Sequence, residues 1–555
     1  MHNPHTRSIA GVALAVVMLL GVPRASLEDG AKLEALIDRY IELRRDGSGS
    51  IPSSAAQRAK TFRGLKTELE SIARGQLSQE QQIDWLALKG QIAGTLHELE
   101  DLRPWEKNPE AFIQFGGAAS ALAQDAPAAA RADRVIEQLQ AAAAALGEVK
   151  AAVQMPPKRF TEGAIYQAGE WLAFLQTDVA AFAKEAGEAR ERVDKANASA
   201  TAALETFLAY LKTDLLPRST GTFAIGREQY ARILQDRWFM DAGPDEILAR
   251  GQNAFAETER LAQELAGRMK PGRPWVEVYE ELKNDHPPAD RLKEEYQARM
   301  DAAQAYLTRH EIVTLPPGER VITIDTPPAR RRSSPFGTFS SVGPFDKELL
   351  GRLVLTPVED HLTPEQRRER LRSHHRAWIP IIAVHEAYPG HHVQALKANE
   401  NPRLLRRVIR ESIFSEGWGL FTEEMMFEQG FLKGDDVRLT QLRNRLWRAA
   451  RVIIDVGMHT GAMTFEDGVK FLVDKVRFEP YAAELEVGMY ARRPTYVLGY
   501  LIGMIEIQEM RAAYEQKFGK PAKPHVFYDR LLRIGALPPS LVRAELLGDM
   551  SRLPR

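Results

Sequence analysis

The sequence predicts a mainly α-helical protein that contains one small antiparallel sheet. Apolar residues recur at helical spacing through most of the chain, short β-branched runs are confined to residues 320–357, and helical patterns resume at residue 363. The 555 residues are 44% hydrophobic and 27% charged, which is ordinary for a soluble globular protein of several domains. A formal net charge of -1 gives no sign of nucleic-acid binding.

Residues 1–25 match the pattern of a secretory signal peptide. Arg7 precedes the uncharged run Ile9–Val22, which is short for a membrane span but fits the apolar core of such a signal. We expect cleavage near Ala25 and a periplasmic or secreted protein; an uncleaved N-terminal anchor is the alternative. No later segment is apolar enough to span a membrane. The absence of cysteine excludes disulfides, thiolate metal sites and a lipid-modified N-terminal cysteine.

Residues 27–310 form the predicted N-terminal helical region. Leu33, Leu36 and Tyr40 share one helix face, and residues 81–102 repeat the pattern. The alanine-rich run 128–153 also keeps its apolar residues at helical spacing, which favours a packed helix over disorder. Prolines between these segments mark the helix boundaries.

Residues 311–555 form the second predicted region, which begins with strands and returns to helices. β-branched residues lie between Pro and Gly in residues 319–328 and 351–360. The Gly/Ser/Pro-rich segment between them, Arg330–Asp346, is predicted to be a loop. The sheet therefore precedes the helix that carries the histidine-rich segment 383–394.

That histidine-rich segment, AVHEAYPGHHVQ, begins like the zinc-peptidase signature His-Glu-x-x-His, but Pro389 occupies the position of the second histidine. His385 and His392 are seven residues apart, or about 10 Å along a regular helix. Zinc–nitrogen bonds are about 2.0–2.1 Å long, so an undistorted helix cannot bring both rings to one ion.

Pro389 and Gly390 offer a way around this distance. Proline cannot donate to the carbonyl of His385 and opens the helix, and glycine adopts dihedral angles that other residues avoid. Together they would loop out two residues and return His391 to a position one turn after His385. The alternative is a helix that ends at Tyr388 and is followed by surface histidines.

The segment HEAYPGHHVQ resembles the motif of domain of unknown function 885. This bacterial family is placed among metallopeptidases, beside the all-helical thimet-oligopeptidase-like zinc enzymes of the gluzincin type. The resemblance continues in residues 415–424, 454–472, 484–503 and 527–542. This chain departs from the family pattern at Gly419, Phe421 and Met489, where alanine, tyrosine and arginine are expected. The match is strong over the C-terminal half. The N-terminal helices resemble those of the family only in their general character.

The resemblance implies one zinc ion per chain, held by His385, His391 and a glutamate from a separate helix. Glu416 is the first choice for that glutamate, and Glu423 is the alternative or a hydrogen-bonded support. Glu386 would be the general base that takes a proton from the attacking water and passes it to the leaving amine.

Residues in the other matching blocks receive supporting roles. Asp455 and His459, four residues apart on one helix face, would support the metal ligands or an oxyanion; a structural Asp–His pair is the alternative. Tyr490 and Tyr500 would donate to the oxyanion that develops during hydrolysis, or else be core tyrosines. His392 would hydrogen-bond near the metal.

Two further features bear on the substrate. Arg492 and Arg493 would pair with its C-terminal carboxylate, or lie at the surface. A strand at Arg352–Pro357 with an exposed edge would pair with an extended peptide and lay it across the zinc.

The leading hypothesis is a hydrolase of peptide bonds in short peptides, whose two helical halves surround a channel. The short substrate and the channel are both implied by the resemblance. A zinc amidohydrolase that acts on non-peptide amides and a helical binding protein with a degenerate metal site are the alternatives.

Overall fold

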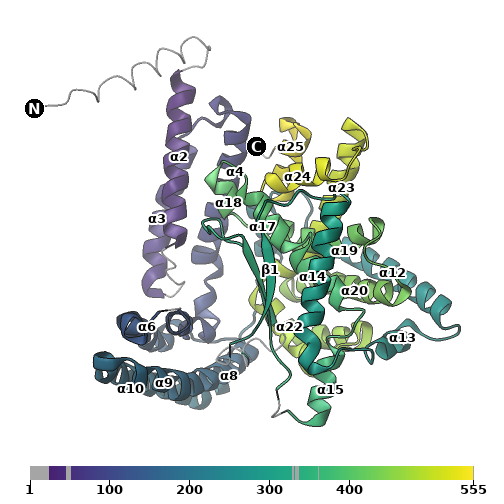
Figure 1. Ribbon diagram of the computed structural model, residues 1–555. Coiled ribbons are helices and arrows are strands. Elements are labelled where there is room, and N and C mark those ends of the chain that lie inside the picture. Colours follow the sequence, from purple (N-terminus) through teal and green to yellow (C-terminus); the bar gives the residue numbers. More distant parts are fainter. Residues whose placement is uncertain are drawn as a thin grey trace, which may run out of the picture.

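The structure, a computed structural model, describes residues 24–45, 52–124, 126–327, 331, 337–359 and 362–553. Within these ranges most residues are helical and three short strands form a single sheet, which confirms the prediction of a mainly α protein (Figure 1). The predicted signal peptide lies outside the described residues, apart from its last two positions. No helix in these ranges combines the length and the apolar character that crossing a membrane requires.

The N-terminal region divides between two hydrophobic cores. The larger core takes in α2 (Arg24–Arg45), α3 (Pro52–Glu70) and α4 (Gln79–Leu96), which stand together at one side of the molecule (Figure 1). The smaller core lies among α6 (Ala128–Gly147), α8 (Lys158–Phe174) and α10 (Arg190–Tyr210). The alanine-rich run is thus a packed helix, as predicted, and its small side chains let α6 approach α10 closely.

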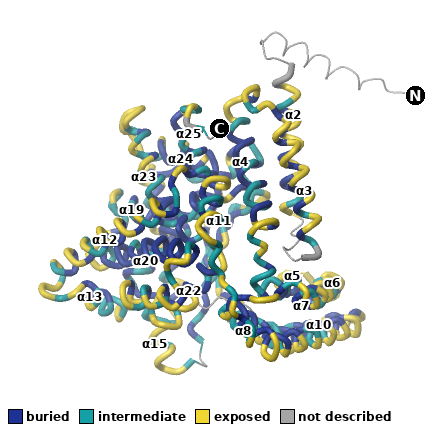
Figure 2. Tube along the Cα trace, turned by 180° about the vertical axis from the view of Figure 1, so that it is seen from behind, coloured by how far each residue is buried: buried dark blue, intermediate teal, exposed yellow. Residues whose placement is uncertain are grey.

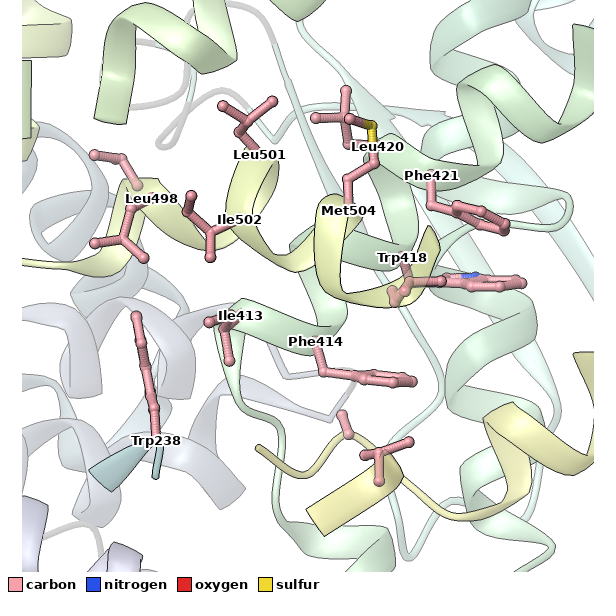
Figure 3. Packing of buried hydrophobic residues seen from close by; sticks show 14 of the residues in the cluster. Trp238, Ile413, Phe414, Trp418, Leu420, Phe421, Leu498, Leu501, Ile502 and Met504 are labelled. Carbon is pink, nitrogen blue, oxygen red and sulfur yellow. The ribbon is translucent and has the colours of Figure 1, made fainter. Parts of the chain in front are cut away.

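Helix α20 (Asp435–His459) is the centre of the larger core and is buried along most of its length (Figure 2). It packs against α12 (Pro244–Met269), while α19 (Ser412–Glu428) packs against α23 (Gly499–Phe518). Figure 3 shows apolar side chains of α19 and α23, among them Trp418 and Met504, in this core. The C-terminal helices therefore share one continuous hydrophobic core.

Helices α19 and α23 touch along their backbones. A β-carbon on Gly503 would lie 1.8 Å from the carbonyl oxygen of Ile413, and one on Gly417 would lie 2.5 Å from backbone atoms of Gly503. No side chain fits between the helices here, so α19 is held firmly in place. The consequence for function is that α19 also carries Glu416 and Glu423.

The sheet has the strand order β1–β3–β2. Strand β1 (Arg320–Asp325) is parallel to β3 (Leu350–Leu355), and β2 (Gly337–Ser340) is antiparallel to β3. The sheet is therefore mixed, and the prediction of a purely antiparallel sheet is wrong, because β2 returns the chain to the end from which β1 started.

The strand predicted at Arg352–Pro357 does not have an exposed edge. It corresponds to β3, which lies between the two other strands, so its backbone groups are already paired on both sides. Strand β2 is an edge strand instead. It lies in the segment predicted as a loop. The prediction missed this strand because Gly and Ser residues hide its period-two pattern.

We expect Gly503→Ala to lower the free energy of unfolding by about 1–3 kcal/mol, because the added methyl group forces α23 away from α19. Gly64→Ala in α3 is the matched control: its β-carbon would meet nothing within 4 Å, and we expect a gain of about 0.5–1 kcal/mol. Thermal unfolding of both variants measures the difference. Equal effects would contradict the backbone contact.

Candidate metal centre

The histidine-rich segment is a helix that opens and starts again. Helix α16 (Ile379–Ile382) widens into one π-helical turn, η13 (Ala383–Ala387), where the Tyr388 N–H donates to the Ala383 carbonyl at 3.1 Å. Helix α17 then begins at His391. Between them, the Gly390 N–H donates to the carbonyl of Val384 at 2.9 Å. The chain therefore turns back on itself within the residues Tyr388–Gly390.

Only glycine fits at position 390. A β-carbon there would lie 1.7 Å from the carbonyl oxygen of His385. Pro389 has no N–H that needs a hydrogen-bond acceptor. Its carbonyl accepts a hydrogen bond from the Trp418 indole at 2.9 Å. The turn is thus closed on one side against its own helix and on the other against α19.

Two imidazoles and one carboxylate converge at this turn. One ligand atom each from His385, His391 and Glu416 lies within 4.8 Å of the others. The Glu416 Oε2 is 3.4 Å from Nε2 of His391 and 3.9 Å from Nε2 of His385. Ligand atoms around a tetrahedral zinc ion with bonds of about 2.1 Å lie about 3.4 Å apart. The separation between Glu416 and His391 has this value and the one between Glu416 and His385 is longer, so the donor types suit zinc and the atoms would have to draw closer around it. We name these three residues the ligand cluster.

Neighbouring groups orient each member of the cluster. Glu423 Oε1 lies 2.9 Å from Nδ1 of His385, which leaves the Nε2 of that ring for the cluster. The Tyr496 hydroxyl donates to Glu416 Oε1 at 3.0 Å, which leaves Oε2 for the histidines. The His385 ring lies over Gly419, where a β-carbon would come within 2.7 Å of the ring. The departure from the family pattern at Gly419 therefore makes room for the ring.

The electrostatics of the cluster favour a cation. Burial alone would raise the pKa of Glu416, but interactions with His385 and His391 lower it well below its usual range. Burial acts to lower the pKa of His385, and interactions with Glu416 and Glu423 outweigh it and raise this pKa to about 9. The His385 ring therefore carries a positive charge at neutral pH when no metal is bound. A bound metal ion would supply the positive charge in its place.

Glu386 and Tyr500 both lie next to members of the cluster. Glu386 is half-buried and, with His391 and Glu416, lines a pocket of about 250 Å³. The Tyr500 ring is nearly parallel to the His385 ring, with centroids 6.3 Å apart, and the Arg451 guanidinium lies 4.5 Å from the Tyr500 centroid. Burial raises the pKa of Tyr500 well above its usual value, so its hydroxyl stays protonated and able to donate.

Tyr490 and His459 do not reach the cluster. The Tyr490 hydroxyl donates to Glu486 Oε2 at 2.8 Å, and the Tyr490 carbonyl accepts from Nε2 of His459 at 3.0 Å. Residue 459 of α20 is turned toward α22 (Pro480–Arg492), so both residues make these hydrogen bonds outside the cluster, and their catalytic roles stay predictions.

Asp455 supports the cluster indirectly. Its Oδ2 accepts from the Tyr230 hydroxyl at 2.6 Å and from the Thr495 N–H at 3.0 Å, next to Tyr496. Burial raises the pKa of Asp455 to about 7 and lowers the pKa of His459 to about 4, so the two form a neutral buried pair between these values. Asp455 therefore holds Thr495 in place, and the next residue, Tyr496, reaches Glu416 with its hydroxyl.

His392 makes its hydrogen bond on another side of α17 than His391, and its predicted place near the metal stays a prediction. Successive residues of a helix point about 100° apart, so His391 and its neighbour serve different sides of α17. The Nε2 of His392 lies 2.9 Å from Glu319 Oε2, which also accepts from the Tyr388 hydroxyl at 2.8 Å. Glu319 thus connects the residues before and after the Pro389–Gly390 turn. Sequence reasoning missed it because it precedes His392 by 73 residues without any local motif.

Arg492 and Arg493 line a different cavity, of about 350 Å³, whose lining also includes Tyr496, the hydrogen-bond donor to Glu416. Arg492 pairs with Glu110 at 3.3 Å, and the Arg493 guanidinium lies 5.4 Å from the centroid of the Tyr496 ring. Sequence reasoning also missed Tyr496, although it precedes Tyr500 by one helical turn.

If the ligand cluster holds a zinc ion, we expect Glu319→Ala to lower the affinity for that ion by about 10–100-fold, because the turn that positions His391 loses its connection. Competition with a chelator measures this affinity. Glu348→Ala removes an exposed carboxylate beside the same sheet and serves as the control. An unchanged affinity of Glu319→Ala, with only a lower unfolding temperature, would show that Glu319 stabilises the fold without positioning the cluster.

Comparison with known proteins places the whole fold in a bacterial group. Two solved structures are similar: a candidate lipoprotein of unknown function from Shewanella oneidensis, with 20% identity, a TM-score of 0.79 and coverage of 93% of this chain and 99% of that one; and a candidate lipoprotein from Colwellia psychrerythraea, with 16% identity, a TM-score of 0.75 and coverage of 94% and 97%. At these identities the likeness shows the fold alone. No curated protein matches. The model of the bacterial protein family of unknown function DUF885 matches residues 47–546, and the chain belongs to this family.

Proposed function

We propose that this protein is a zinc-dependent hydrolase of amide bonds in short peptides. The observation that carries the proposal is the ligand cluster, with the carboxylate of Glu386 opening into the same pocket as His391 and Glu416. A zinc ion held there would activate a water molecule and polarise the carbonyl group of the substrate. The resemblance of HEAYPGHHVQ to gluzincin-type peptidases agrees with this donor set.

Each residue of the proposed site would have its own role in the reaction. His385, His391 and Glu416 would hold the metal. Glu386 would take a proton from the attacking water and deliver it to the leaving nitrogen. Tyr500 is the remaining candidate for donating to the oxyanion, because its ring packs beside His385 while Tyr490 is engaged elsewhere.

Strand β2 is the best candidate for positioning an extended substrate. Phe339 of β2 lines the pocket that contains Glu386, and one edge of β2 has no neighbouring strand within the described sheet. A peptide that paired with this edge would pass the ligand cluster. This proposal replaces the one made for Arg352–Pro357.

A position outside the cytoplasm is part of the proposal. It is supported by the signal-like pattern of residues 1–25 and by the two similar structures, which are described as candidate lipoproteins. A lipid anchor on an N-terminal cysteine is not carried over, because this sequence contains no cysteine.

We expect Glu386→Gln to retain one zinc ion per chain and to lose roughly 10²–10⁴-fold in peptide hydrolysis, because the general base is removed while the ligands remain. His391→Ala should lose the zinc itself. Metal analysis and hydrolysis of a peptide library measure the two effects.

Glu428→Gln, at the exposed end of α19, is the matched control and should change neither quantity. A Glu386→Gln variant as fast as the parent would contradict the general-base role. A parent protein that binds no zinc would favour the helical binding protein with a degenerate site. Acylated amides in the same library separate the peptidase from a hydrolase of other amides.

A further inference from the structure

The pocket beside Glu386 is small and has walls of different character. Its volume is about 250 Å³, below the roughly 300–1,000 Å³ of typical ligand pockets. Glu386, His391 and Glu416 form one wall. Apolar groups line much of the rest; these are Phe339, Ala395, Ala398, Ile409 and Ala536. The space suits a group about as large as one amino acid residue, with an apolar side chain.

Arg410 is the one Lys or Arg side chain that lines this pocket; it is exposed, and the nearest acidic influence on its pKa is that of Asp346. Its Nη2 donates to the carbonyl of Val342 at 2.7 Å, which fixes the direction of the guanidinium. Within the described part of the chain, no carboxylate lies within 4.0 Å of it. An arginine has five N–H donors, so this contact leaves several free for a ligand.

Gln394 supplies a second donor. It is 6% exposed, and its Nε2 has no hydrogen-bond partner among the described residues. It lies three residues after His391 on α17 and lines the same pocket. A buried amide N–H without an acceptor is unfavourable, so a ligand oxygen at this point would be stabilised.

We propose that Arg410 and Gln394 bind a free carboxylate on the leaving side of the cleaved amide. This rests on the proposed hydrolase function and names its substrate class: an acyl or peptidyl group joined through an amide to an amino acid with an unblocked α-carboxylate. A planar guanidinium binds both oxygens of a carboxylate, and Gln394 donates to one of them. The apolar wall takes the side chain of the released amino acid.

The reaction balances with water alone. The amide C–N bond breaks and a C–O bond to the water oxygen forms. Glu386 carries one proton of the water to the departing nitrogen. The products are a carboxylic acid and a free amino acid, whose carboxylate stays beside Arg410 until it leaves.

This assignment moves carboxylate recognition away from Arg492 and Arg493. Arg492 is already paired with Glu110, and both arginines line the larger cavity, which shares no lining residue with the pocket of Glu386. Arg410 is therefore the better candidate for binding the substrate carboxylate, because it lines the same pocket as Glu386.

The test compares substrates that differ only at the C-terminus. Short peptides and N-acetylated amino acids are offered as free acids and as amides, to the parent and to Arg410→Gln. We expect the parent to prefer the free acids by a factor of roughly 30 or more, and Arg410→Gln to lose that preference. Arg407→Gln is the matched control: this arginine also donates to a backbone carbonyl, that of Pro344, but does not line the pocket.

A second measurement does not depend on turnover. Zinc-loaded Glu386→Gln protein is titrated calorimetrically with the same free acids and amides, with and without Arg410→Gln. Tighter binding of the free acids that disappears with Arg410→Gln supports the proposal. Equal binding and equal hydrolysis of acids and amides overturn it and leave the hydrolase function standing.

The remaining outcomes are also decisive. A parent that hydrolyses nothing contradicts the proposed function, while the calorimetric comparison still decides whether Arg410 recognises a carboxylate. A preference that is lost in Arg493→Gln and kept in Arg410→Gln assigns recognition to the larger cavity and overturns the proposal.

Discussion

The close approach of Gly390 to the carbonyl of His385 is the constraint on which the candidate site depends. In a regular helix His385 and His391 would be too far apart to bind one ion. The π-helical turn and the break after it bring their ring centroids to 5.0 Å. Because the contact is with backbone, only glycine permits it. The site is thus built by interrupting a helix rather than by using its regular spacing.

A turn of this kind needs external support, and it receives it from three directions. Trp418 of α19 binds the Pro389 carbonyl, and Glu319 joins the residues on either side of the turn. The backbone contact between α19 and α23 fixes the third ligand relative to the other two. Helix packing therefore limits the movement of the ligand cluster.

The features that could be predicted from the sequence have two sources. Pro389 and Gly390 indicate an interrupted helix by local pattern, whereas the choice of Glu416, 25 residues past His391, depended on the family resemblance. Glu319, β2 and the true direction of His459 could not be predicted in this way. Glu319 acts across 73 residues, Gly and Ser hide the alternation of β2, and the face that His459 presents depends on which helices surround α20. Each of these is a tertiary effect.

The charges around the cluster would link the binding of a metal to that of the proposed substrate. Glu386, Glu416 and Glu423 all act on His385, whereas Arg448 and Arg451 lie beside the Tyr500 ring and do not line the pocket. Among the residues that line the pocket, Arg410 is the one Lys or Arg, and Glu386 and Glu416 are the carboxylates. With Glu423 beside His385, the three carboxylates outnumber the two cations, Arg410 and the charged His385, so a substrate carboxylate would meet net negative charge unless a divalent ion were already bound. Metal and substrate would therefore favour each other's binding, and by thermodynamic linkage each would raise the affinity for the other by the same factor.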